Sequence, residues 1–490
     1  MSALEQHSHS SLSSSRTGLQ AFITFQHQPV NARASVLFAL ESAVSRGCVK
    51  IVEGSTVHCL GGVDGRCVTI EVVSPNFWTR MLSHGDLGFS EAYMAGEILI
   101  EDLPGIMNLW LDNEAGMSSN TSIFIRLTTA ISGMSNAFFG QTPTNSKLNA
   151  IASYDQSNKL FKAFLDEKMM YSCALWGDEE GGPSGDLTFR NDDRSNELEA
   201  AQMRKIHHVL RTARLRPGDR LLEFGSGWGA LAIEAARTYG CEVDTITLSQ
   251  EQKRLADERI RAAGLQEHVR VHLMDYRELP PDFEKAFDAF VSVEMIEHVG
   301  SKYYEAYFEI VDWALKAEGA TAVISSSTFP ESRYTEYQAE DFMRKYMWPN
   351  SCLPSPTALI NAARTGAQGR FALSSVENHS AHYPRTLREW NKRLGANLTQ
   401  TLLAEDLPAV GADLSAFDAF MRKWRYFFAY AGAGFDRGYI SCHMLSFVRE
   451  FFFEWLLSYL LALRGKRNHA RVRAGVVSVE RPMENENNMG

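Results

Sequence analysis

The stretch Leu221–Leu231, with the sequence LLEFGSGWGAL, places three alternating glycines directly after an apolar run. Glycine inside a helix or strand is destabilising, because it loses more conformational freedom on folding than other residues. What glycine permits is a positive φ angle and the close approach of a ligand to the backbone. An acidic residue, Glu223, stands two places before the first glycine. The stretch therefore predicts a ligand-binding turn between a strand and a helix.

Strands and helices alternate on both sides of this turn. Apolar runs typical of buried strands occupy 219–224, 242–248, 268–275, 286–293 and 320–325, and helical patterns occupy 194–215, 230–240, 249–264 and 301–315. Nearly continuous apolar strands between helices are typical of a parallel sheet that is buried on both faces. We predict an α/β fold with a doubly wound, Rossmann-like sheet, whose ligand crevice lies beyond the carboxyl ends of the strands.

The remaining sequence divides around this sheet. Short apolar runs separated by Gly and Asp turns predict a smaller N-terminal α+β domain. A later stretch, rich in helical patterns and aromatic residues, predicts a helical cap over 330–445. The predicted organisation is a disordered tail (1–19), the α+β domain (20–111), a connector (112–150), the sheet domain with its cap and a C-terminal helix (151–470), and a second tail (471–490).

Composition restricts the class of protein. The net charge of −10 argues against a nucleic-acid binder, whose surface is usually basic. The seven cysteines form no CxxC pair and no regular framework, which indicates reduced thiols in an intracellular protein. The Ser-rich N-terminus has no apolar core, so it is not a secretory signal, although an organelle-targeting peptide stays open.

The longest apolar segment lies near the C-terminus, at 447–467. Arg449, Glu450 and Glu454 interrupt it, so it falls short of the roughly 18 apolar residues that a spanning helix needs. It predicts either a packed C-terminal helix or a membrane-surface helix. In the second case, basic residues would face anionic headgroups: Arg464, Lys466, Arg467, Arg471 and Arg473.

Two ligands compete for the glycine turn. A dinucleotide site would have G-x-G-x-x-G followed by an acidic residue at the tip of the second strand. Here the tip carries Thr247–Ser249, and Asp244 lies inside the strand. The pattern E-x-G-x-G-x-G instead resembles the loop of class I S-adenosylmethionine (SAM) methyltransferases. That resemblance implies that Glu223 faces the ammonium group of SAM and that the glycines pass under its methionine portion.

Further sequence motifs along the chain make the resemblance more specific. In order, they are GDLGFSEAYMAGEI (85–98), MMYSCALW (169–176), FGSGWG with TLSQEQ (224–252), MDYREL (274–279), SVEMIEHVG (292–300), RKYMWPNSCLPS (344–355), HYPRTLREW (382–390) and RKWRYFFAYAGAGF (422–435). Together they resemble the family of cyclopropane fatty acid synthases and mycolic acid cyclopropane synthases. The resemblance covers roughly residues 80–450.

This resemblance implies a reaction. Family members transfer a methyl group from SAM to a cis double bond of an acyl chain, which leaves a carbocation on that chain. A base then removes a proton from the new methyl group, and the ring closes. In the family the base is a bound bicarbonate, whose pocket here should use Cys173 (through its backbone), Glu297 and Tyr383. Ser325 stands where the family usually has His or Gln as a further bicarbonate ligand.

The same resemblance implies cofactor contacts at Tyr171–Ser172 and around the ends of the first three predicted strands. They are Tyr171, Ser172, Glu223, Gly225, Ser226, Gly227, Trp228, Gly229, Thr247, Leu248, Ser249, Gln252, Asp275 and Tyr276. No metal ion is expected. We expect His298 to be structural, and aromatic clusters such as Trp424–Tyr430 to stabilise the cation.

The expected activity is therefore cyclopropane formation on unsaturated phospholipid acyl chains, with SAM as methyl donor and bicarbonate as base. The resemblance implies a cytoplasmic, peripherally membrane-associated homodimer that acts on phospholipid and binds no nucleic acid. Three alternatives stay open. They are alkene methylation without ring closure, which the short side chain of Ser325 keeps open, a small-molecule N-methyltransferase, and a lipid-binding protein without activity.

Overall fold

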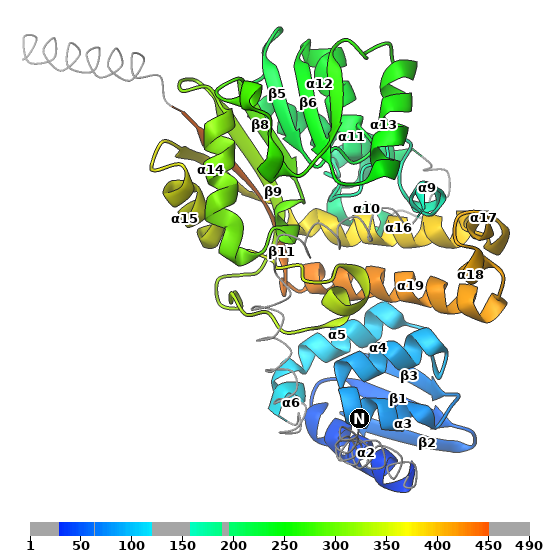
Figure 1. Ribbon diagram of the computed structural model, residues 1–490. Helices are drawn as coiled ribbons and strands as arrows, with labels where there is room; N and C mark the ends of the chain where they lie inside the picture. Colours follow the sequence, from blue (N-terminus) through cyan, green and yellow to red (C-terminus); the bar gives the residue numbers. More distant parts are fainter. Residues whose placement is uncertain (1–28, 63, 120–156, 189–195, 450–490) are drawn as a thin grey trace, which may run out of the picture.

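The computed structural model describes residues 29–62, 64–119, 157–188 and 196–449. The predicted tails (1–19 and 471–490) and most of the connector lie outside these residues. Three layers are visible in Figure 1. A large sheet with its helices lies at one end, helices α16 (Tyr383–Asn397) and α19 (Leu414–Asp436) lie in the middle, and the N-terminal domain lies at the other end.

The large sheet has the strand order β10-β11-β9-β8-β5-β6-β7. Its five parallel strands are β5 (Arg220–Phe224), β6 (Glu242–Thr247), β7 (Val269–Leu273), β8 (Ala289–Val293) and β9 (Thr321–Thr328). Two antiparallel strands, β10 (Ala372–Asn378) and β11 (Ser441–Val448), extend it at one edge. The predicted doubly wound α/β sheet is confirmed.

Side-chain alternation along the strands fills both faces of this sheet. Leu221 of β5 packs with α11 (Glu197–Thr212), α12 (Ala230–Tyr239) and α13 (Gln250–Ala262). Leu222 and Phe224 point to the opposite face, toward α14 (Tyr304–Ala314) and α15 (Pro356–Gly366). Because successive side chains of a strand alternate, Glu223 lies on the face of Leu221, beside α12.

Two sequence predictions near the C-terminus are corrected. The segment 330–445 is not only a cap, because 372–378 and 441–448 form the strands that extend the sheet. The helix predicted to begin at 447 is wrong at its start, since Phe447 and Val448 belong to β11. Strand β11 lies between two neighbours, and this pairing over its whole length outweighs the helical pattern that follows it. The rest of the predicted helix lies outside the described residues.

The N-terminal domain is a four-stranded sheet in the order β2-β1-β3-β4, with helices packed against it. Its strands are β1 (Cys48–Glu53), β2 (Thr56–Gly61), β3 (Cys67–Val72) and β4 (Ile98–Ile100). Its helices are α2 (Pro29–Ala43), α3 (Asn76–His84), α4 (Asp86–Ala95), α5 (Leu103–Asp112) and α6 (Glu114–Ser119). The predicted α+β character of this domain matches the described part.

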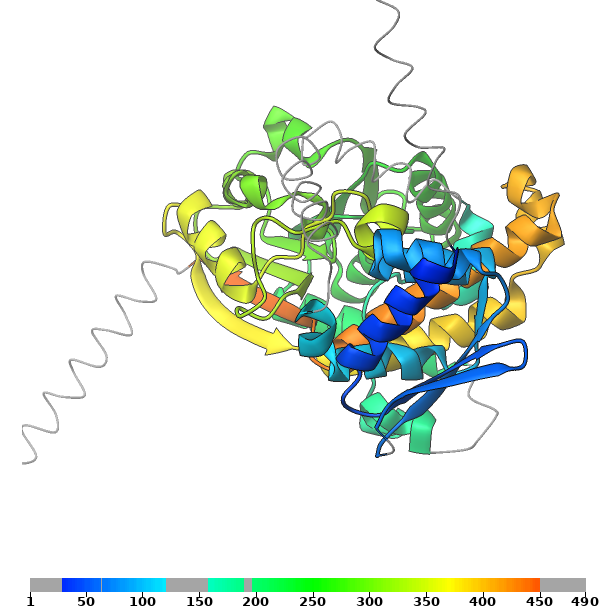
Figure 2. The same ribbon diagram turned by 90° about the horizontal axis from the view of Figure 1, so that it is seen from below.

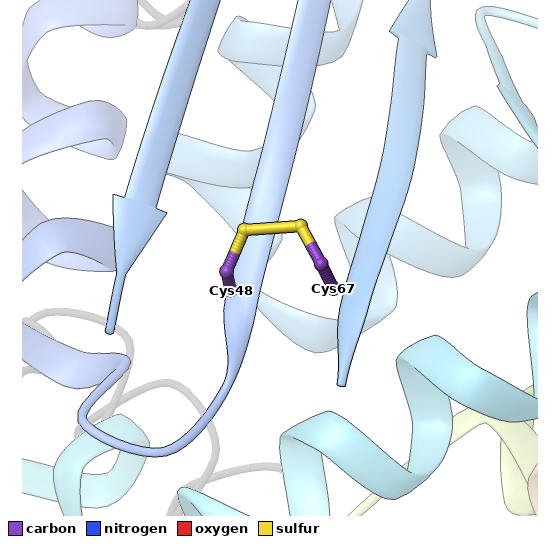
Figure 3. The surroundings of a disulfide bond; sticks show 2 residues. All are labelled: Cys48 and Cys67. Carbon is purple, nitrogen blue, oxygen red and sulfur yellow. A yellow bond between two sulfur atoms is a disulfide. The ribbon is translucent and has the colours of Figure 1, made fainter. Parts of the chain in front are cut away.

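A disulfide joins Cys48 to Cys67 across β1 and β3 (Figure 3). The prediction that all cysteines are reduced is therefore wrong for this pair. The two residues face each other in the parallel ladder, with Cα atoms 4.4 Å apart, so the register of the sheet brings them together. The spacing of the cysteines in the sequence carried no sign of this register. The other five cysteines are free thiols, and four of them are buried.

The middle layer joins the two domains. Helices α16 and α19 pack on each other, and α9 (Asn158–Phe164), α17 (Gln400–Ala404) and α18 (Pro408–Gly411) surround them. In the view from below, the blue N-terminal domain covers the orange helix α19 (Figure 2). The rings of Phe89 and Tyr93 on α4 both contact Tyr426 on α19. Among the described residues, no helix is both long and apolar enough to cross a bilayer.

Candidate active site

Two cavities meet at the carboxyl end of the sheet. The smaller has a volume of about 150 Å³ and is lined by the glycine turn and the ends of β6 and β8. The larger has a volume of about 340 Å³, and its walls come from the N-terminal domain, α16, α19 and the segment after β8. Tyr171, Glu294 and His298 line both cavities. A group transferred between the two cavities would therefore pass these three residues.

The glycine turn behaves as its sequence predicts. Gly225, Gly227 and Gly229 have φ angles of 94°, 49° and 83°, which lie in the region that favours glycine. A Cβ atom at Gly227 would meet no protein atom within 4 Å, because this glycine faces the smaller cavity. A Cβ atom at Gly229 would lie 3.2 Å from Ala256 Cβ, so this glycine serves the packing of α12 on α13.

The structure brings nearly all of the predicted cofactor residues together. Those that line the smaller cavity are Tyr171, Ser172, Glu223, Gly225, Ser226, Gly227, Trp228, Thr247, Leu248, Ser249, Gln252, Asp275 and Tyr276. Gly229 is the exception, and it contributes through helix packing instead.

Glu223 places a carboxyl group at the floor of the smaller cavity. It is buried, and Thr245 Oγ1 donates a hydrogen bond of 2.6 Å to its Oε2. Burial raises the pKa of this carboxyl group to about 8, because its charged form loses contact with water, and in the described part of the chain no cation offsets this. A ligand ammonium group would supply that compensation. The residues present therefore fit the amino-acid portion of SAM.

Asp244 is the acidic residue of the second strand that a dinucleotide site would need for the ribose, but here its role is structural. It is buried within β6 and contacts Arg220, Arg270 and His272. Burial would raise its pKa, but the hydrogen bonds from these three neighbours lower it to about 2. With its oxygens engaged on the strand, Asp244 is not placed to bind a ribose.

A pair of carboxyl groups lies at the junction of the cavities. The Cys173 N–H donates 2.8 Å to Glu294 Oε1, and the Tyr383 hydroxyl donates 2.5 Å to Glu294 Oε2. Tyr383, at the start of α16, is held by a stacked contact with Phe435, whose ring centroid is 4.1 Å away. Burial raises the pKa of Glu294, and the bonds from Tyr383 and Cys173 oppose that shift. Sequence reasoning missed Glu294, although it stands three residues before Glu297.

Glu297 lies in a 3-10 turn, Ile296–His298, directly after Glu294. Its Oε1 accepts 2.6 Å from the Ser327 N–H, and its Oε2 is buried without a hydrogen-bond partner among the described residues. Burial raises the pKa of Glu297 to about 8, and the negative charge of Glu294 adds to this shift. His298 is half-buried between the two cavities, and desolvation lowers its pKa to about 4, which keeps its ring neutral.

Ser325 is placed differently from the sequence prediction. It lies in β9 opposite Met444, and its carbonyl accepts 2.8 Å from the Glu294 N–H. Ser325 is absent from the residues that line the two cavities, whereas Ser327 lines the larger one. The residue at a strand end that reaches a cavity depends on where the strand stops, and β9 continues to Thr328.

The larger cavity is mostly aromatic and aliphatic. Trp348 and Phe427 meet edge to face with centroids 5.1 Å apart, and both line this cavity. Its other aromatic members are Trp110, Tyr171, Phe329, Tyr383, Trp390, Tyr426, Tyr430, Phe435 and Tyr439. Such walls exclude water and offer ring faces to a cation.

A cluster of metal-ligand type residues lies away from both cavities. One ligand atom each of His208, Glu377 and His379 lies within 4.8 Å of the others. Glu377 Oε2 contacts His208 Nε2 at 2.6 Å and His379 Nε2 at 3.2 Å. These two hydrogen bonds account for the grouping, so we assign it a structural role.

Residues 141–445 match the mycolic acid cyclopropane synthetase family. The chain belongs to this family. It is 33% identical over 396 residues to a tuberculostearic acid methyltransferase of Mycobacterium tuberculosis, covering 80% of this chain and 85% of that protein. It is 33% identical over 324 residues to the cyclopropane-fatty-acyl-phospholipid synthase of Escherichia coli, covering 66% and 76%. As a member, the chain is a SAM-dependent methyltransferase that modifies lipids.

Solved structures confirm the fold. A cyclopropane synthase of M. tuberculosis superposes with a TM-score of 0.50 at 22% identity, covering 62% of this chain and 98% of that one. A coclaurine N-methyltransferase superposes with a TM-score of 0.56 at 17% identity, covering 74% and 99%. At these identities the likeness concerns the fold alone.

The bicarbonate expected for this family fits the residues poorly. The two donors predicted to hold it, the Cys173 N–H and the Tyr383 hydroxyl, both bind the carboxylate of Glu294. A second anion at this place would lie beside the Glu294 carboxylate that these donors hold. Like charges in a buried site disfavour each other, so we derive no step through bicarbonate.

Proposed function

We propose that this enzyme transfers the methyl group of SAM to a cis double bond of an unsaturated phospholipid acyl chain and closes a cyclopropane ring. The observation that supports this best is the shared wall of Tyr171, Glu294 and His298 between the cofactor cavity and an apolar cavity. An apolar cavity that opens onto the cofactor suits an acyl chain better than a polar amine.

The residues of this chain would position the two substrates, exclude water and provide a carboxylate. SAM, when bound, supplies an electrophilic methyl group on a sulfonium. Glu223 and the glycine turn would hold its methionine portion, and the aromatic cavity would hold the alkene in line with it. The aromatic walls would keep water from the cationic acyl chain. A carboxylate at the junction would take the proton whose loss closes the ring.

The substrate has to reach this cavity from a membrane. At about 0.8 kcal/mol per methylene, exposing a dozen methylenes to water costs roughly 10 kcal/mol. The proposal therefore includes action at the surface of a phospholipid bilayer by a peripherally bound cytoplasmic protein. The family resemblance is the support for a homodimer, which sedimentation at working concentration would test.

The similarity to one relative supports a second candidate product. The relative that matches 80% of this chain is named a tuberculostearic acid methyltransferase. The rival product is an acyl chain that is methylated without ring closure. Both products require attack by the same alkene and loss of a proton, so the two cavities serve either outcome.

The test is lipid analysis of cells that express this chain and lack a synthase of their own. Mass spectrometry and NMR of the acyl chains should show cyclopropyl signals at former cis double bonds. A methyl or methylene branch would keep the alkene chemistry and reject ring closure. Unchanged acyl chains, with SAM bound by the purified protein, would contradict the proposed function.

A further inference from the structure

The carboxylate of Glu294 occupies a clamp with two donors. One oxygen accepts from the Cys173 N–H at 2.8 Å and the other accepts from the Tyr383 hydroxyl at 2.5 Å. The donors come from sequence positions 121 and 89 residues away, so the tertiary fold builds the clamp around this side chain. The clamp lies at the junction of the cofactor cavity and the apolar cavity, because Glu294 lines both.

The backbone at Glu294 supports a specific role for this residue. Its φ angle is 50°, in the left-handed region that non-glycine residues adopt rarely. The Ser325 carbonyl holds this conformation by accepting 2.8 Å from the Glu294 N–H. Non-glycine residues in this region persist where the surroundings over-determine them, often at functional sites.

Several titratable groups surround the Glu294 carboxyl group at the junction. Glu297 follows on the same segment, Tyr383 comes from α16, and Cys442 comes from β11. Lys205 of α11 is fully buried nearby and donates 2.5 Å to Ser172 Oγ. Burial raises the pKa of Glu294 and lowers that of Lys205, whereas the two donors of the clamp and the charge of Lys205 oppose the shift at Glu294 and stabilise its carboxylate form.

We propose that Glu294 is the base of the reaction and takes the place of bound bicarbonate in this chain. The proposal rests on the proposed function. The alkene attacks the methyl carbon, the carbon–sulfur bond breaks with its electron pair left on sulfur, and the acyl chain becomes a cation. A Glu294 oxygen then takes a proton from the new methyl group, whose C–H electron pair closes the ring. The Glu294 proton later leaves to solvent.

The first test compares Glu294→Gln with the wild type on phospholipid vesicles that contain cis-monounsaturated chains. An amide cannot take the proton, so kcat should fall by about 10²- to 10⁴-fold. The dissociation constant for S-adenosylhomocysteine and the melting temperature should stay near wild-type values. Glu234→Gln is the matched control, because Glu234 is a buried carboxyl group outside both cavities. Wild-type kcat in Glu294→Gln would overturn the proposal.

The second test uses buffers purged of carbon dioxide. Wild-type turnover should be the same with and without added bicarbonate. Glu294→Gly frees the clamp and suits the positive φ angle, so this variant should be inactive without bicarbonate and recover with it. Wild-type turnover that depends on bicarbonate, or a Glu294→Gly protein that bicarbonate fails to rescue, would overturn the proposal. A wild-type protein that binds S-adenosylhomocysteine but alters no acyl chain would instead overturn the proposed function.

Discussion

At the scale of single residues, the site depends on carboxyl groups whose charge is controlled by burial. Glu223 and Glu297 both have their pKa raised to about 8, chiefly because their charged forms lose contact with water. Glu223 lies under the cofactor cavity, and Glu297 lies in the wall of the apolar cavity. The two groups are therefore neutral near pH 7 until a ligand or neighbour supplies positive charge.

Binding of the cofactor should consequently release a proton from Glu223. Below pH 8 the free protein holds this proton, and an ammonium group beside the carboxylate would displace it. The affinity for S-adenosylhomocysteine should therefore rise with pH between about 5.5 and 7.5, by up to about tenfold per pH unit. Calorimetry in buffers of different ionisation enthalpy measures both the affinity and the released proton.

Glu223→Gln is the control for this measurement. It should bind more weakly and with no dependence on pH in the same range. A wild-type affinity that does not change with pH would mean that Glu223 keeps its proton in the complex.

At the scale of elements, the close packing of helices α3 and α4 explains why a glycine stands at position 88, away from any ligand site. Gly88 of α4 lies against α3, and a Cβ atom there would stand 2.1 Å from the Arg80 carbonyl oxygen. Gly395 of α16 is exposed, and a Cβ atom there would meet its nearest neighbour, Arg425, at 4.0 Å. Replacing these two helical glycines with alanine should therefore have opposite effects on stability.

Gly88→Ala should destabilise the N-terminal domain by about 1–3 kcal/mol, because α3 and α4 would have to move apart. Gly395→Ala should instead stabilise its helix by roughly 0.5–1 kcal/mol. Urea unfolding followed by circular dichroism measures both. Equal effects of the two substitutions would contradict the packing described for α3 and α4.

At the scale of the whole molecule, the apolar cavity exists only because three layers meet. Met107, Trp110 and Leu111 of α5 form one wall, and α19 and the segment after β8 form the others. The cofactor cavity is built by the sheet domain without the N-terminal domain. The two binding events should therefore respond separately to substitutions in α5.

Leu111→Arg should lower kcat/KM for vesicle substrates by about tenfold or more, because it places a charge in the apolar wall. The affinity for S-adenosylhomocysteine should not change. Leu82→Arg, at an exposed position of α3, is the matched control and should leave both quantities near wild type. An equal loss in both variants would assign the effect to vesicle contact instead of the cavity.

Much of the architecture was predictable because it is local in the sequence. The alternation of strands and helices from 194 to 325, the glycine turn and the strand-end residues all follow from patterns within one segment. Parallel strands bring their carboxyl ends to one edge, so residues predicted at separate strand ends line one cavity. Strands β10 and β11 were missed because they lie among helical segments and pair only at the antiparallel edge.

The sequence by itself determined the sheet, the cofactor turn and the family of this protein, because each rests on short-range patterns. Only the tertiary structure decided the disulfide, the cavity position of Ser327 instead of Ser325, and the clamp on Glu294. These features join atoms from distant segments, and their distances depend on strand register and on how α16 packs. A hydrogen bond forms only when donor and acceptor lie within a few ångströms of each other. The packing of the elements therefore decides which carboxylate Tyr383 binds, and the spacing of residues in the sequence does not.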